Sequence, residues 1–115
     1  MFCDASLQGY GCKLGHKVSD SWWTKTKLDR FGNNINALEL LAVLYSIKSF
    51  TSELKSKALL VGSNNMTAVW YLNEFGGIKS PICNQLTKET WEICVKHDIS
   101  LVAAHIHGCE NSDAD

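Results

Sequence analysis

The stretch from Asn36 to Phe50 restricts the possible folds of this chain more than any other part of it. Its apolar residues follow helical spacing on two faces: Leu38, Leu41, Ala42 and Tyr45 on one, Leu40, Val43, Leu44 and Ile47 on the other. A helix that is apolar around most of its girth is predicted to be largely buried, so other elements must cover it. Asn36 is the predicted N-cap, and Glu39 is placed as its capping-box partner.

The rest of the chain predicts strands and helices that can provide this cover. Residues 25–34 are expected to be a polar connection. The expected strands are 2–5, 10–14, 17–24, 57–63 and 99–106, and the further helices run from Asn64–Asn65 to Phe75, ended by Gly76–Gly77, and from Ser80–Pro81 to about Lys96. Strands joined first by hairpins and then by helices predict an α/β fold, with a mixed sheet and helices on its faces. A chain of 115 residues is expected to form one domain.

Composition excludes a membrane-spanning protein. Hydrophobic residues make up 45% of the chain, charged residues 20%, and no apolar run is long enough to span a membrane. The net charge of −1 does not by itself indicate a nucleic-acid binder. Residues 1–33 nevertheless hold five basic groups against three acidic ones. This basic third could contact phosphates or could be an ordinary solvated face, and the sequence leaves both open.

The five cysteines, Cys3, Cys12, Cys83, Cys94 and Cys109, are expected to be reduced and buried. Their number is odd, no two are spaced as C-x-x-C, and several lie among apolar residues, which does not favour a disulfide framework. No signal peptide is recognised at the start of the chain. An intracellular location, cytoplasmic or nuclear, is therefore expected.

Polar side chains follow several of the predicted strands at the ends where α/β sheets build their sites. Asp4, Glu39, Ser63–Asn65 and residues 111–115 could converge there. A carboxylate cluster requires cations, so convergence predicts a divalent metal site. Taken singly, Asp4 is more simply a surface or turn residue, Glu39 a helix-capping residue, and Asp113 with Asp115 an acidic tail.

The chain resembles the RNase H domain of retroelement reverse transcriptases, of the DIRS-like and gypsy-like groups. The resemblance extends along almost the whole sequence, and each matching string is weak alone. The strings are Asp4-Ala5-Ser6 with Gly9-Tyr10-Gly11; Ile35-Asn36-Ala37-Leu38-Glu39-Leu40 with Ala42-Val43; Ser63-Asn64-Asn65 with Thr67-Ala68-Val69 and Tyr71-Leu72-Asn73; Gly76-Gly77 with Ser80-Pro81; and His105-Ile106 with Gly108, Asn111 and Ala114-Asp115.

The resemblance implies an RNase H-like fold, a five-stranded mixed sheet with helices on both faces. It implies hydrolysis of the RNA strand of an RNA–DNA hybrid by two Mg²⁺ or Mn²⁺ ions held by four carboxylates. An upstream reverse transcriptase domain would be a natural partner, and no membrane is involved. The hybrid would be recognised by its groove shape and 2′-hydroxyls.

Carried over residue by residue, the catalytic positions are Asp4, Glu39, Asn64 and Asp115, and the metal ligands are Asp4, Glu39 and Asp115. Asn64 stands where the family has aspartate. Asparagine is nearly isosteric but neutral, so weakened metal binding and little or no nuclease activity are expected. The helix that the family places after the fourth carboxylate is missing, so Asp115 is expected to fray.

Two further features carry weaker expectations. His105 and His107 could form a metal pair, but His105 is more simply a hydrogen-bonded residue at a strand end. Trp70 and Trp91 are predicted core residues, and Trp22 and Trp23 are candidates for stacking or for core packing.

Three interpretations of function therefore remain open. The first is a retroelement RNase H domain that is structurally intact but catalytically impaired. The second is an active nuclease in which Asp113 or Mn²⁺ compensates for Asn64. The third is a non-catalytic module that binds nucleic acid or protein.

Overall fold

The structure is a computed structural model that describes residues 1–31, 34–74 and 80–106. Its strands and helices follow the predicted order closely. They are β1 (Phe2–Ala5), β2 (Gly9–Leu14), β3 (Lys17–Trp22), α1 (Lys25–Phe31), α2 (Ile35–Ser49), α3 (Thr51–Leu54), β4 (Ala58–Ser63), α4 (Met66–Asn73), α5 (Pro81–Lys96) and β5 (Ser100–His105).

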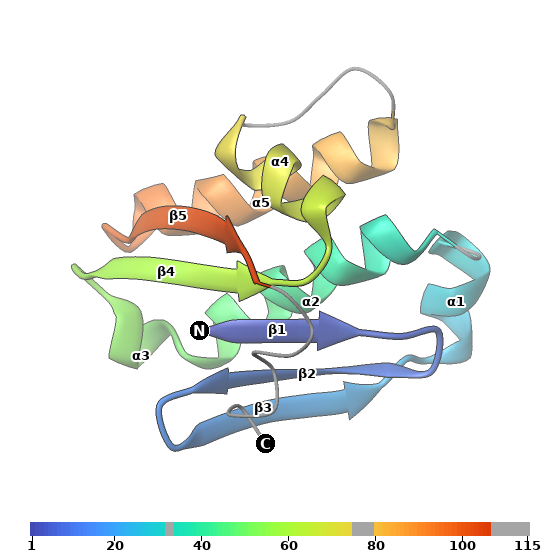
Figure 1. Cartoon of the computed structure of the whole chain (residues 1–115), viewed down its shortest axis with the longest axis horizontal. Coiled ribbons are helices and arrows are strands. Elements are labelled where there is room, and N and C mark those ends of the chain that lie inside the picture. The colour runs from blue at the N-terminus through green and yellow to red at the C-terminus, as the bar shows by residue number, and fades with distance from the viewer. Residues whose placement is uncertain (32–33, 75–79, 107–115) are drawn as a thin grey trace.

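The five strands form one mixed sheet in the order β3-β2-β1-β4-β5. β1, β2 and β3 make an antiparallel meander, whereas β1, β4 and β5 run parallel. Figure 1 shows α2 and α5 together behind the sheet, with the opposite sheet face toward the viewer. The predicted fold class is confirmed in its main features, a five-stranded mixed sheet packed by helices.

The core lies between this sheet and α2. Sheet residues that alternate along the strands, such as Cys3, Val61 and Leu101, are buried on the side of the helices. Every residue from Ala37 to Leu44 is buried as well. The prediction of a helix enclosed on most of its girth is confirmed, because α2 contacts β1 and β2 on one side and α4 and α5 on others.

The other face of the sheet is open across the strands that the structure describes. Val18, Trp22, Leu60 and Val102 are 57 to 78% exposed there. The helices of the described ranges gather on one face, so helical cover of the second face stays a prediction.

Three local predictions are corrected. Asn34, not Asn36, caps α2, since its side-chain oxygen accepts a hydrogen bond from Ala37 N at 3.1 Å. Residues 25–31, expected to be a connection, form the short helix α1. Trp70, expected in the core, is 50% exposed on α4.

Other predictions of caps and packing hold. The Ser80 hydroxyl accepts from Cys83 N at the start of α5, with Pro81 in its first turn. Trp91 packs against the core and donates from its ring nitrogen to Leu72 O at 2.9 Å. Gly76–Gly77, predicted to end the preceding helix, lie outside the described residues.

The expectation that all cysteines are free is wrong for one pair. Cys3 and Cys12 form a disulfide between β1 and β2. The antiparallel register places them directly opposite each other, with Cα atoms 4.2 Å apart. Sequence spacing alone does not show this register. Cys83 and Cys94 are free and buried, as predicted, and Cys109 lies outside the described part of the chain.

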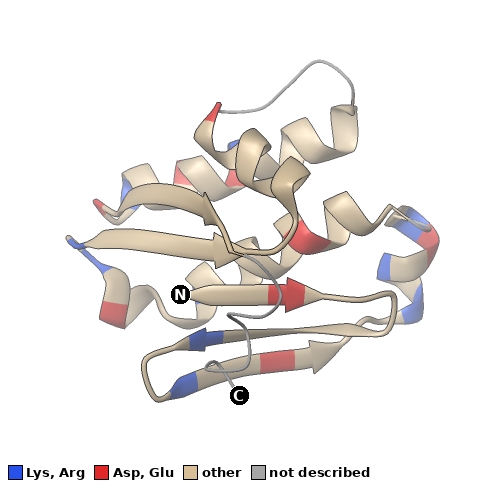
Figure 2. Ribbon diagram, in the orientation of Figure 1, with Lys and Arg blue, Asp and Glu red and all other residues tan. Residues whose placement is uncertain are grey.

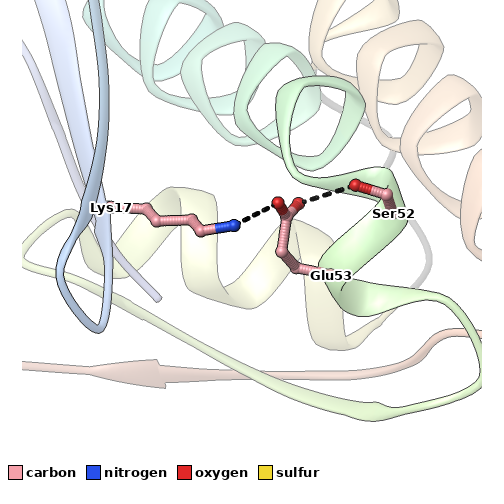
Figure 3. Close-up of polar contacts among 3 residues, drawn as sticks. All are labelled: Lys17, Ser52 and Glu53. Carbon is pink, nitrogen blue, oxygen red and sulfur yellow. Dashed lines mark hydrogen bonds and ion pairs between the residues drawn. The ribbon is translucent and has the colours of Figure 1, made fainter.

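An ion pair joins the meander to α3 at one end of the sheet. Lys17 on β3 pairs with Glu53, whose second carboxylate oxygen accepts from the Ser52 hydroxyl at 3.1 Å (Figure 3). The pair is at the surface and contributes little to stability. Across the described ranges, no helix has both the length and the apolar character needed to cross a membrane.

Candidate functional site

The candidate site lies where two adjacent parallel strands of the sheet end, and we call this place the crevice. The pairing of β1 with β4 includes Phe2 with Gly62 and Cys3 with Ser63, the last residue of β4. Open α/β sheets bind ligands at the carboxyl ends of such strands.

The Glu39 side chain fills this crevice from α2. Its Oε1 accepts a hydrogen bond from Ala5 N at 2.7 Å, and its Oε2 accepts from the Ser63 hydroxyl at 3.3 Å. One carboxyl group therefore joins the end of β1 to the end of β4. Glu39 is not a capping residue, because Asn34 caps α2.

Burial disfavours the ionised form of the Glu39 carboxyl group. Glu39 is 2% exposed, and loss of hydration raises its pKa to about 7. The neighbouring Asp4 carboxylate also raises the pKa, whereas the hydrogen bonds from Ala5 and Ser63 lower it. Near neutral pH the Glu39 carboxyl group can therefore hold a proton.

Asp4 is the exposed member of the pair. It lies on β1, opposite Gly11 of β2, and borders an open hollow on the uncovered sheet face together with Gly9 and Trp22. The predicted convergence of Asp4, Glu39 and Ser63 is therefore seen in the structure. Their catalytic roles stay a prediction.

The residues after β4 form the rim of the crevice. Asn64 is exposed directly after the strand, and its carbonyl oxygen lies 3.2 Å from His105 Nε2. His105 is thus a hydrogen-bonded residue at the end of β5, the simpler of its two interpretations. Asn65 caps α4 through Ala68 N and also donates to Asn36 Oδ1 at 2.9 Å, which ties α4 to α2.

The remaining candidates fall outside the part of the chain that the structure describes. These are Asp115, the fourth predicted catalytic position, together with His107, Asn111 and Asp113. Their predicted roles are therefore untested.

The donor set at the crevice fits a hard divalent ion only in part. Within residues 1–31, 34–74 and 80–106, no three His, Cys, Asp or Glu residues are grouped as a metal site. Asp4 and Glu39 supply two carboxylates, and Mg²⁺ is commonly held by one or two carboxylates, water and substrate phosphates. These two residues fit one such ion, and a second ion would need further ligands.

The roles of two polar groups that contact Glu39 were not predicted. The Ser63 hydroxyl and the Ala5 N–H orient Glu39, and the sequence identified their positions but not their contacts.

A third contact was not predicted either. The Trp23 ring nitrogen donates to Ser6 O at 2.7 Å and fixes the turn that follows β1. A tryptophan next to a turn gives no signal of such a bond in sequence.

Comparisons with known proteins agree on the fold. No protein-family model matches the sequence, and no curated protein matches it either. The structure resembles RNase H1 from the halophilic archaeon Halobacterium salinarum NRC-1, with a TM-score of 0.71 and 12% identity over 98% of this chain and 89% of that one. It also resembles LC11-RNase H1, solved in complex with an RNA/DNA hybrid, with a TM-score of 0.70 and 20% identity over 97% of this chain and 87% of that one.

These likenesses establish an RNase H-like fold for the chain. This fold brings Asp4, Glu39 and Ser63 together at the crevice between β1 and β4.

Proposed function

We propose that this chain is an RNase H-like domain that binds RNA–DNA hybrids and cleaves their RNA strand weakly or not at all. One observation supports this above the others. In an RNase H-like fold, the Glu39 carboxyl is held between the ends of β1 and β4, beside Asp4. The hybrid bound in the LC11-RNase H1 structure supports the class of ligand.

The residues of the crevice would have different roles in this function. Asp4 and Glu39 would hold a Mg²⁺ or Mn²⁺ ion, which supplies Lewis-acid stabilisation of the phosphate when bound. Ala5 N–H and the Ser63 hydroxyl keep the Glu39 carboxyl in one orientation. Such positioning and electrostatics provide nearly all of phosphoryl-transfer catalysis.

Asn64 is the reason to propose weak catalysis. It follows β4 at the rim of the crevice, where an aspartate would add a third carboxylate near Asp4 and Glu39. An amide provides one neutral oxygen instead, so a metal is bound less tightly and its position is less fixed. Asp115 is proposed as a further carboxylate of the same site.

We also propose a retroelement origin. The proposal depends on the ordered strings of the sequence, notably Asn36-Ala37-Leu38-Glu39-Leu40 and Ser63-Asn64-Asn65. A reverse transcriptase domain encoded upstream is the partner that this origin implies.

A cleavage assay tests the proposed activity. The purified chain and the Asn64→Asp variant are incubated with an end-labelled RNA–DNA hybrid and Mg²⁺. We expect little product from the unmodified chain and a rate greater by about 10²-fold for the variant, since one well-placed electrostatic group contributes on this order. Asp4→Asn in the variant background is the control and should abolish the gain. Efficient Mg²⁺-dependent cutting by the unmodified chain would contradict the proposal of impaired catalysis.

The second candidate function is a binding module without catalysis. Burial of Glu39, which raises its pKa to about 7, favours this candidate because a proton can then neutralise the carboxyl group in place of a metal. Titration of hybrid and single strands separates the possibilities. A hybrid-binding domain should prefer the hybrid, whereas a protein-interaction module should bind both equally poorly.

A further inference from the structure

The basic residues of the first third of the chain are concentrated on one helix. α1 carries Lys25, Lys27 and Arg30 against the single acidic Asp29. Of the other basic residues in this third, Lys17 is paired with Glu53 at the far end of β3 (Figure 3). The described part of the chain provides no such ion pair for the three cations of α1.

The start of α1 is fixed to the turn that follows Asp4. Trp23, two residues before the helix, is buried and donates from its ring to Ser6 O at 2.7 Å. Its backbone N–H donates to Gln8 O at 2.9 Å, and its ring lies 5.0 Å from the ring of Tyr10. These contacts hold α1 beside the carboxyl end of β1.

The end of α1 is fixed to the helix that carries Glu39. The N–H of Asn34, which caps α2, donates to Phe31 O at 3.1 Å. The Lys27 ammonium lies 4.5 Å from the centroid of the Tyr45 ring of α2, a cation–π contact that limits its motion. α1 is therefore held by the turn that follows β1 and by α2, and these lie next to Asp4 and carry Glu39, respectively.

Figure 2 shows the result for the whole molecule, with Lys and Arg gathered on α1 at the end of the sheet toward which β1 runs. The crevice itself is acidic, because Asp4 and Glu39 meet there. A polyanion that crosses two carboxylates needs cations nearby to offset the repulsion, and phosphate contacts supply most of the affinity for nucleic acids.

We propose that α1 binds the phosphate backbone of the hybrid, with Lys25, Lys27 and Arg30 as phosphate contacts that position it over Asp4 and Glu39. This inference rests on the proposed function, since it takes the hybrid to cross the crevice. In this proposal α1 positions the hybrid and adds affinity. It does not recognise bases, because lysine and arginine contacts to phosphate carry no sequence information directly.

The test measures how hybrid binding depends on salt. The α1 variant is Lys25→Gln with Arg30→Gln, which leaves the contact of Lys27 with Tyr45 intact. The control is Lys55→Gln with Lys57→Gln, which removes the same charge near the α5 end, where Ser56 N donates to His97 O. Affinity for a fluorescent RNA–DNA hybrid is measured by anisotropy between about 50 and 200 mM salt, with a chelator present.

We expect the slope of log affinity against log salt to be shallower by about 2 for the α1 variant, since each phosphate contact contributes about 0.9. Its affinity near 0.1 M salt should fall by at least about 10-fold. The control should match the unmodified chain in slope. The single variant Lys25→Gln should lose about 1 in slope, and it disturbs no packed side chain.

The two levels of the proposal fail in different ways. If the unmodified chain does not bind hybrid above single strands, the proposed function fails and this inference with it. If it binds hybrid while the α1 and control variants have equal slopes, α1 is not the phosphate contact, and the proposed function stands. Thermal unfolding of each variant verifies that it is folded.

Discussion

The Glu39 carboxyl is nearly excluded from water and still has no fixed positive partner among the described residues. It is stabilised by donors, Ala5 N–H and the Ser63 hydroxyl, rather than by a cation. Ionisation of such a group costs free energy in the folded protein, and this cost is absent in the unfolded chain. The pKa of about 7 expresses this difference.

The free energy of unfolding should therefore depend on pH through Glu39. Between about pH 4.5 and pH 7 the folded state binds more protons at this carboxyl than the unfolded state does. The contribution of Glu39 to the free energy of unfolding is fully present below that window. It decreases as pH rises through the window and does not change further above it. A shift of this size corresponds to roughly 3 kcal/mol. Urea unfolding of the metal-free protein in chelator between pH 5 and 8 measures it.

Glu39→Gln is the control for this prediction. Glutamine cannot ionise, and its carbonyl oxygen can still accept from Ala5 N. At pH 8 the free energy of unfolding of the variant should be equal to or higher than that of the unmodified chain. At pH 5 it should be equal to or lower than that of the unmodified chain. Parallel stability curves for the two proteins would show that Glu39 does not titrate in this window.

The identity of these residues could be predicted, but their environment could not. The predicted parallel strands are enough to bring Asp4 and Ser63 to one edge, because parallel strands share their carboxyl ends. The sequence also suggested Glu39 as a capping partner, since glutamate three residues after an asparagine fits that pattern equally well. Only the position of β1 against α2 distinguishes a cap from a buried carboxyl group.

α2 and α4 are joined at their first turns by a pair of asparagines. Asn65 accepts from Ala68 N as the cap of α4, and its amide donates to Asn36 of α2. One side chain therefore stabilises a helix start and a contact between two helices at the rim of the crevice.

Substitution of Asn65 should separate these two contributions. Asn65→Ala removes both hydrogen bonds and should lower the free energy of unfolding by about 1–2 kcal/mol. Asn65→Asp keeps the oxygen that caps α4 and loses only the donor to Asn36, so its loss should be smaller, about 1 kcal/mol or less. Urea denaturation compares the three proteins. Equal losses for both variants would mean that the cap contributes nothing.

The elements that were predicted well have strong local signals. Ser80 with Pro81 marks the start of α5, and the apolar run of Leu59, Leu60 and Val61 marks β4. The sequence does not predict α1 because this helix is short and charged, with only Leu28 and Phe31 at apolar spacing. The helix begins where the Thr24 hydroxyl accepts a hydrogen bond from Lys27 N at 3.2 Å. Trp70 was misplaced because α4 buries Ala68, Val69, Tyr71 and Leu72 instead, which leaves Trp70 on the outer side.

The arrangement of the whole sheet follows from its connections. β1, β4 and β5 lie in that order, so both parallel crossovers step in the same direction across the sheet. Right-handed crossovers that step in one direction place their helices on one face. The sequence predicted the strands and the mixed sheet, but the side of each helix depends on strand order, which local patterns do not encode. This arrangement leaves Asp4 on an open sheet face, accessible to a large ligand.

The Cys3–Cys12 bond affects the molecule chiefly through its unfolded chain. It joins neighbouring strands that are already paired, so it adds little order to the folded sheet. In the unfolded chain it closes a loop between residues separated by nine positions, which lowers the entropy of that state.

Reduction should therefore destabilise the protein without changing its fold. For a loop of this length we expect the free energy of unfolding to fall by about 2–3 kcal/mol when a reductant is added. Cys12→Ala should show no response to reductant, whereas Cys83→Ala should respond as the unmodified chain does, because Cys83 is free. Thiol titration of the unfolded protein should find two more reactive groups after reduction than before it. If reductant changes neither the free energy of unfolding nor the number of reactive thiols of the unmodified chain, the bond does not form. The expectation of free thiols from the sequence would then be correct.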